Sequence, residues 1–249
     1  MLDIVLFGKY VLLFLGGLFS GIVNVLAGGG SFVTLPILSL FGLPPSVANG
    51  TNRIAILLQN VSATANFMKN KMLDIPLATR LLIPTMTGAI LGTSIAIKIP
   101  ERWLQTSLGI IFLFMAVYMM LPERKKRRKT DNNVAVLLRH LVFFLIGIYG
   151  GYIQAGVGFF LVTALTKLEH VELKMANAMK IVLTLAFTFV SLLLFTVGKK
   201  VEIVPGMVLG AGSFIGGAVG AKLNSILGVK VIKTVLVGMM IISALLYIF

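Results

Sequence analysis

Two basic residues stand inside apolar segments, where charge is costly. Arg53 follows Ala48-Asn-Gly-Thr-Asn52 and leads into a long apolar run, and Lys180 has the same place in the second half of the chain. Ionisable side chains within a membrane segment usually face a cavity or a partner, yet all 8 acidic residues fall at segment ends or in loops. Two such cations without nearby carboxylates indicate an anionic ligand. The alternative is that both side chains snorkel to the membrane surface from near their helix ends.

Two glycine-rich breaks interrupt the apolar pattern. Ala27-Gly28-Gly29-Gly30-Ser31 separates two apolar runs, and Ala155-Gly156-Val157-Gly158 does the same in the second half. Non-helical backbone at membrane depth persists only where protein or a water-filled cavity covers it, and paired breaks in two repeats indicate a transporter's binding site. The freed N–H groups near Ser31 and Phe159 would favour an anion. Alternatively, the glycines form tight turns or permit close helix packing.

Asn24 and Gln154 precede the two breaks at corresponding positions. A side-chain amide in an apolar helix needs a polar partner, which is either a neighbouring helix or a substrate, and both alternatives stay open. The chain has no cysteine, and its 2 histidines lie near segment ends. The sequence thus contains no arrangement at membrane depth that indicates a catalytic site, a metal site or a cofactor. We expect a protein that is not an enzyme.

The apolar segments that carry these residues leave little of the chain over. The 249 residues have a mean hydropathy of +1.02 and are only 12% charged, against roughly a quarter in a soluble domain. At about 20 apolar residues per crossing, we predict an all-α integral membrane protein with about eight to ten transmembrane segments. Among these segments, 31–43 and 158–168 are too short to cross alone. The segments lie roughly at 4–27, 31–43, 47–68, 76–98, 103–121, 135–155, 158–168, 174–197, 203–221 and 229–249.

The two halves of the chain resemble each other. Short motifs recur in the same order: Ala48-Asn49, Arg53, Gly88, Gly92 and Lys98 in the first half, and Ala176-Asn177, Lys180, Gly212, Gly216 and Lys222 in the second. We therefore expect a first membrane repeat at 1–121, a basic linker at 122–134 and a second membrane repeat at 135–249. With five segments in each half, the second repeat would be inverted relative to the first.

Basic residues outnumber acidic ones by 22 to 8. They collect in short loops, above all in the linker 122–134, and Lys/Arg-rich short loops stay cytoplasmic. We therefore expect this linker on the cytoplasmic side of the cell (inner) membrane, near lipid headgroups, and expect no nucleic-acid partner. The number of crossings and the oligomeric state stay open, with a homodimer among the alternatives.

The glycine-rich motifs resemble those of the TauE/SafE sulfite exporter family. The similarity lies in Gly17-Leu-Phe-Ser-Gly21, in the run from Ala27 through Pro36 to Leu38, in Ala48-Asn-Gly-Thr-Asn52 and in the second-half glycines from Gly150 to Gly158. It implies a bacterial or archaeal permease for sulfite, sulfonates and related small anions. Asn52-Arg53 and Phe159-Phe160 depart from the family pattern, which leaves the particular anion open.

From these observations we expect a permease that holds a small anion between the halves and alternates access by rocking one repeat against the other. The alternatives are an anion channel without alternating access and a non-transporting membrane assembly partner. The expected substrate-binding residues are Asn24, Gly28, Gly29, Gly30, Ser31, Asn52, Arg53, Gln154, Gly156, Gly158 and Lys180.

Overall fold

The computed structural model describes residues 2–120, 136–223 and 229–248, and these residues form ten α-helices. The expected all-α membrane fold is confirmed, and the helices match the apolar segments of the sequence closely. The expected linker 122–134 lies outside the described residues. The helices are α1 (Leu2–Ala27), α2 (Ser31–Leu40), α3 (Pro45–Lys69), α4 (Ile75–Lys98), α5 (Glu101–Met120), α6 (Val136–Tyr152), α7 (Val157–Leu168), α8 (Leu173–Val197), α9 (Ile203–Leu223) and α10 (Val229–Ile248).

Five of these helices are long and apolar enough to cross a membrane. They are the parts of α1, α4, α5, α8 and α9 at Leu6–Ala27, Ile75–Lys98, Glu101–Met120, Leu173–Val197 and Ile203–Leu223. α3 is as long as α8, with 25 residues, but many of its side chains are polar and buried. The outer surface instead carries large apolar side chains such as Phe7, Trp103 and Val197. Lipid is therefore the solvent of this surface, and the buried polar side chains of α3 face the protein interior.

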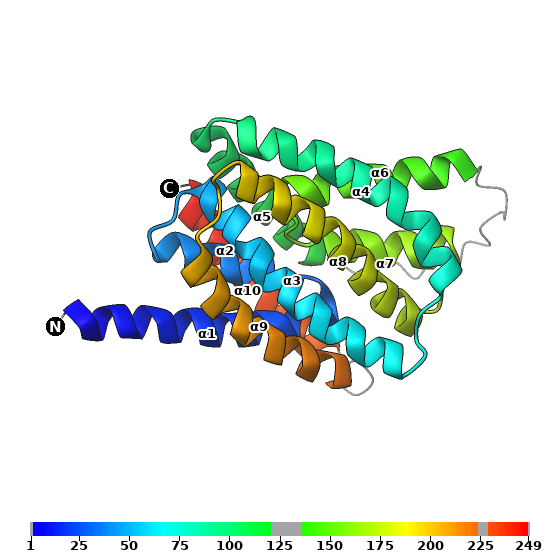
Figure 1. Ribbon diagram of the computed structural model, residues 1–249, viewed down its shortest axis with the longest axis horizontal. Helices are drawn as coiled ribbons and strands as arrows, with labels where there is room; N and C mark the ends of the chain where they lie inside the picture. Colours follow the sequence, from blue (N-terminus) through cyan, green and yellow to red (C-terminus); the bar gives the residue numbers. More distant parts are fainter. Residues whose placement is uncertain (1, 121–135, 224–228, 249) are drawn as a thin grey trace.

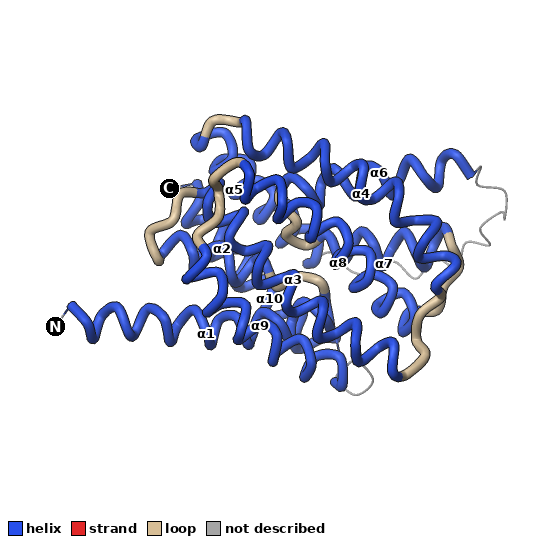
Figure 2. The backbone as a smooth tube through the Cα atoms, in the orientation of Figure 1, coloured by secondary structure: helices blue, strands red, loops and turns tan. Residues whose placement is uncertain are grey.

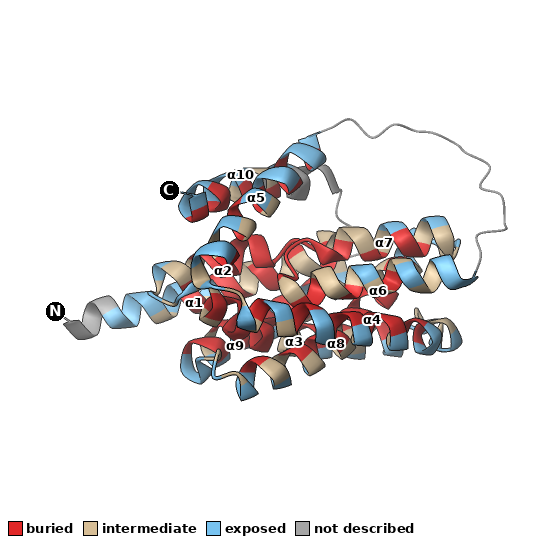
Figure 3. Ribbon diagram, turned by 90° about the horizontal axis from the view of Figure 1, so that it is seen from above, coloured by how far each residue is buried: buried red, intermediate tan, exposed pale blue. Residues whose placement is uncertain are grey.

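The two halves of the chain interlock. α1 packs along α9 and α4 packs along α6, so the first helix of each half lies against the fourth helix of the other. α3 and α8 contact each other, while α5 and α10 form a pair beside the main bundle (Figure 3). α1 and α6 enter from opposite ends of the bundle (Figure 1). Two inverted repeats would pack in this way. The packing supports the division into repeats at 1–121 and 135–249, which stays a prediction.

Glycines let the interlocked helices approach to backbone contact. A methyl group on Gly88 would overlap the Phe144 carbonyl of α6, and one on Gly212 would overlap the Phe14 carbonyl of α1. Lipid supplies no hydrophobic force between helices, so close packing of this kind holds them together. The matched glycines of the two halves therefore serve packing in equivalent interfaces.

The short helices α2 and α7 begin inside the bundle. Figure 2 shows the loops before α2 and before α7 in the middle of the molecule, away from the loops at its ends. α2 turns back along α1, so that Ile37 meets Gly16, and α7 turns back along α6, so that Phe160 packs on Tyr149. Each half thus contributes one helical hairpin, α1–α2 or α6–α7, whose tip is a glycine-rich break.

Candidate functional site

The two glycine-rich breaks touch each other at the centre of the molecule. A Cβ atom on Gly28 would lie 2.8 Å from the Gly158 Cα. Gly28 and Gly156 have left-handed backbone, with φ of 79° and 74°, which glycine adopts without a steric cost. The tips of the hairpins α1–α2 and α6–α7 are therefore in direct backbone contact.

The contact brings two helix N-termini together. The first N–H groups of a helix lack partners within it, and the aligned peptide dipoles place partial positive charge there. The residues before α2 and α7 are Gly30 and Gly156, which have no side chain to accept from these N–H groups. Backbone carbonyls of the breaks accept from several of them, including the Phe159 N–H that the sequence predicted to be free, so the dipoles are the main contribution of these helix ends. The centre of the molecule therefore carries positive potential from two directions.

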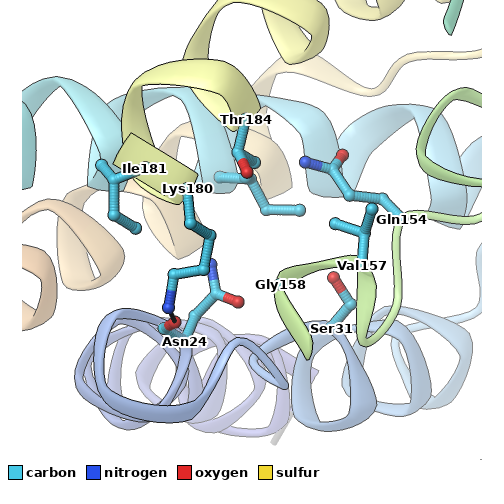
Figure 4. A pocket seen from close by; sticks show the side chains of 9 residues that line it. Asn24, Ser31, Gln154, Val157, Gly158, Lys180, Ile181 and Thr184 are labelled. Atoms are coloured by element: carbon cyan, nitrogen blue, oxygen red, sulfur yellow. Dashed lines mark hydrogen bonds between the residues drawn. The ribbon is translucent and has the colours of Figure 1, made fainter. Parts of the chain in front are cut away.

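A small cavity lies beside this contact (Figure 4). Its volume is about 10 Å³, the space that one ordered water needs. A polyatomic anion needs more room, so binding requires movement of the walls. The lining residues are Asn24, Ser31, Ile56, Gln154, Val157, Gly158, Lys180, Ile181 and Thr184, five of which the sequence predicted as site residues.

Lys180 lines this cavity and also caps the C-terminus of α1. Its side chain lines the cavity and is only 2% exposed. The ammonium donates to the Val25 carbonyl at 3.0 Å and the Asn24 carbonyl at 3.3 Å, both in the last turn of α1, and to Asn177 Oδ1 at 3.4 Å. A cation at a helix C-terminus satisfies carbonyls without helical partners and compensates the dipole. Lys180 thus caps α1 while facing the cavity.

Arg53 caps a helix C-terminus as Lys180 does, but it does not line the cavity. Its Nη1 donates to the Gly150 carbonyl at 2.7 Å, and its Nη2 donates to the Gly151 carbonyl at 2.9 Å, both in the last turn of α6. Nη1 also donates to Gln154 Oε1, and Nη2 donates to Asn49 Oδ1 at 3.2 Å. The side chain is fully buried and lies outside the cavity lining. Arg53 therefore reaches the cavity only through Gln154.

These contacts revise one step of the sequence argument. Two buried cations without buried carboxylates do not by themselves require an anion, because the C-terminal carbonyls of α1 and α6 accept their hydrogen bonds. Snorkelling does not describe Arg53 or Lys180 either, because both side chains form their hydrogen bonds inside the protein. The case for an anion rests instead on the two helix N-termini and on the cavity-facing position of Lys180.

Gln154 links Arg53 to the cavity wall. It lies in the second break with a φ of 66°, a conformation that is uncommon for residues with a side chain. Its amide accepts from Arg53 and donates to Thr188 Oγ1 at 2.6 Å. The Gly150 and Gly151 carbonyls accept from Arg53 as the Asn24 and Val25 carbonyls accept from Lys180. Aligning the two capped helix ends on these carbonyls pairs Gln154 with Gly28. The sequence match of Gln154 with Asn24 is therefore displaced by about one helical turn.

Among the other predicted residues, Asn52 and Gly30 support the cavity walls, whereas Gly29 does not. Asn52 donates to Ser31 Oγ at 3.1 Å and accepts from Thr34 Oγ1 at 2.6 Å, so it holds α2 against α3. The Gly30 N–H donates to Asn24 Oδ1 at 3.3 Å. Gly29 faces α10, because a Cβ atom on it would lie 2.9 Å from Leu236 Cδ2.

Thr184 is the polar lining residue that sequence reasoning missed. It follows Lys180 by four residues, and residues four apart lie on the same helix face. The spacing was therefore a usable signal, because a hydroxyl one turn beyond an embedded cation faces the same space. Its position adds a neutral donor to the cavity wall opposite Ser31 (Figure 4).

Comparison with known proteins gives a consistent result. The family "Sulfite exporter TauE/SafE" matches residues 13–247, in agreement with the resemblance seen in the sequence. A "Probable membrane transporter protein" of Haemophilus influenzae is 26% identical over 91% of this chain and 89% of its own length. "Probable membrane transporter protein YfcA" of Escherichia coli is 27% identical over 90% of this chain and 84% of its own. No solved structure gives a significant match.

Proposed function

The chain belongs to the TauE/SafE sulfite exporter family, and on that premise we propose that it carries a small anion of the sulfite or alkyl sulfonate type by alternating access. The family is one of membrane transporters, and the similar proteins are described as probable membrane transporters. The observation that carries the finer proposal is the convergence of Lys180 and the N-termini of α2 and α7 on one cavity. Sulfite and sulfonates present several oxygen atoms to such donors.

The polar groups around the cavity suit an oxyanion. Lys180 supplies a positive charge, Ser31 and Thr184 supply hydroxyl groups, and the lining includes no carboxylate. Backbone N–H groups at a helix N-terminus bind anions readily. The side-chain amides of Asn24 and Gln154 complete the polar wall, and the apolar Ile56, Val157 and Ile181 would face the organic part of a sulfonate.

The capping contacts give the transport cycle a physical basis. An anion that enters the cavity competes with the Val25 carbonyl for the Lys180 ammonium, so binding weakens the cap of α1. Arg53 stays bound to α6 throughout, since the Gly150 and Gly151 carbonyls that accept its hydrogen bonds lie outside the cavity lining. The anion therefore has a different affinity for the two states of the hairpin α1–α2, which is the requirement for shifting between them.

Flux measurements test this proposal. The purified protein is reconstituted into liposomes, and uptake of labelled sulfite and of methanesulfonate is followed for the wild type. We expect saturable uptake that is accelerated by unlabelled anion on the opposite side, because a carrier exchanges its two states. Uptake that rises linearly with concentration and shows no such acceleration would indicate a channel, and no flux of either anion would overturn the sulfur-anion proposal.

Orientation needs a separate test. We propose that the linker 122–134 lies on the cytoplasmic side of the cell membrane, in support of which its basic residues follow the positive-inside rule. The chain has no cysteine, so a single cysteine placed in the linker reports its side directly. A membrane-impermeant maleimide added to intact cells should leave this cysteine unlabelled. Labelling in intact cells would show that the linker lies on the outer side of the membrane.

A further inference from the structure

A groove runs along the outer side of the hairpin α6–α7. Val142 and Ile146 of α6 and Phe160, Ala164 and Lys167 of α7 line it, and its volume is about 300 Å³. A second hollow of about 280 Å³ shares Val142, Ile146 and Phe160 and continues to Tyr149. The lining is mostly apolar, with Thr163 as a neutral polar residue and Lys167 as an exposed cation at the end of α7.

We propose that this groove binds one acyl chain of an anionic phospholipid, with the lipid phosphate against Lys167. An apolar groove on a lipid-facing surface is filled by hydrocarbon, because water has no polar partners there. A basic residue at its end selects lipids with a net negative headgroup. This site is separate from the central cavity, and the proposal does not depend on the transported anion.

The difference between the two hairpins explains why a lipid is needed here. In the hairpin α1–α2, α10 covers α2, and Ser243 donates to the Phe32 carbonyl at 2.8 Å. Within the described chain, α5, the counterpart of α10, reaches only the start of α7, where Met115 lies beside Gly156. The rest of α7 lacks the helix that its counterpart has. An acyl chain takes the place of that helix against α6 and α7.

The charges at the end of the groove favour a phosphate. Arg139 lies on the same face of α6 as Val142 and Ile146 at spacings of three and four residues. Its ion pair with Glu169, at 3.4 Å, compensates that carboxylate, whose side chain is only 6% exposed. The acidic side chain nearest to Lys167 in the chain, Glu169 at the end of α7, is therefore compensated by Arg139, and the Lys167 ammonium is available to a headgroup.

The inner end of the groove reaches toward the second break. Phe160 and Tyr149 pack edge to face at 5.2 Å, and the Tyr149 hydroxyl donates to the Ala155 carbonyl in the break. Phe160 and Lys167 are seven positions apart, which corresponds to about 10 Å of helix, so the upper part of one acyl chain fits between headgroup and break. A bound lipid would brace the hairpin tip from outside.

Direct lipid binding tests the site. The protein is purified with defined mixtures of phosphatidylglycerol and phosphatidylcholine, and native mass spectrometry measures which lipid stays bound. We expect the wild type to retain phosphatidylglycerol preferentially, Lys167→Ala to lose this preference at least several-fold, and Lys167→Arg to keep it. Lys174→Ala is the matched control, because Lys174 is exposed near the same end but lies outside the groove.

A second variant tests the groove independently of the charge. Ala164→Phe fills the apolar part and should release the lipid while Lys167 is still present. Both variants are compared with the wild type in thermal unfolding with phosphatidylcholine alone, so that a folding defect is recognised. Equal retention of phosphatidylglycerol by the wild type, Lys167→Ala and Ala164→Phe would overturn the proposal, as would equal retention of the two lipids by the wild type.

Discussion

Arg53 and Lys180 hold equivalent places and cap equivalent helices, yet their surroundings differ. Arg53 makes four hydrogen bonds, is fully buried and lies outside the cavity lining. Lys180 makes three hydrogen bonds, at 3.0, 3.3 and 3.4 Å, and faces the cavity. A planar guanidinium is suited to a fixed set of acceptors, whereas an ammonium is a point charge that exchanges partners readily. One cation therefore stabilises the fold, and the other is free to respond to a ligand.

The residue before each cation shows the same division. Asn52 precedes Arg53 and ties α2 to α3 through Ser31 and Thr34. Met179 precedes Lys180 and is buried among apolar side chains. The α2 helix thus has polar hydrogen bonds to its neighbouring helix at the position where α7 has apolar packing. If the two halves are repeats, as the sequence predicts, equivalent positions in them have taken different structural roles.

The largest effect should come from Arg53→Ala. It leaves the Gly150 and Gly151 carbonyls and the Gln154 amide without their charged donor, and each buried acceptor left without a partner costs about 1–3 kcal/mol. We expect a lower midpoint of thermal unfolding in detergent, with partial recovery in Arg53→Lys. Wild-type stability together with abolished flux would instead identify Arg53 as a direct ligand and remove the contrast with Lys180.

Gly28→Ala should have the next largest effect, about 2 kcal/mol, because it adds strain at positive φ to a clash with Gly158. Gly42→Ala is the matched control, because Gly42 also has positive φ but has no atom within 4 Å of an added Cβ. The difference between the two unfolding midpoints measures the contact between the breaks. Equal midpoints would mean that the breaks can separate at no cost.

Lys180→Ala should separate transport from stability. We expect flux to fall at least about tenfold, equivalent to about 1.4 kcal/mol, with a smaller loss of unfolding free energy than for Arg53→Ala. Lys174→Ala, on the exposed part of the same helix, should transport normally. Liposome uptake and thermal unfolding are measured on the same preparations. Unchanged flux in Lys180→Ala would contradict the assignment of Lys180 to the anion.

The smallest effect should come from Thr34→Val, which removes the 2.6 Å hydrogen bond to Asn52. Loss of one neutral buried hydrogen bond costs about 1 kcal/mol. Thr166→Val in α7 is the comparison, because its hydroxyl bonds only to carbonyls of its own helix. A larger loss of unfolding free energy for Thr34→Val would support the pinning of α2. Equal losses would show that this contact does not distinguish the hairpins.

The sequence predicted the helices well because most apolar runs are long and because charged or glycine-rich loops separate most of them, including the two short runs that became α2 and α7. It also identified both embedded cations and both breaks, since charge and repeated glycine stand out in apolar surroundings. It could not identify the partners of Arg53, because the Gly150 and Gly151 carbonyls belong to backbone that any residue type would supply. For the same reason, the contact of Gly28 with Gly158 could be found only in the folded chain.

The capping of α1 and α6 also has a consequence for biosynthesis. Lys180 follows Val25 by 155 residues, whereas Arg53 precedes Gly150 by 97. Chains are made from the N-terminus and fold in part during synthesis. When α6 emerges from the ribosome, Arg53, which caps it, has already been synthesised. The C-terminus of α1, by contrast, has no capping cation until Lys180 is inserted with α8. The first half of the nascent chain therefore remains an unfinished structure that the second half completes.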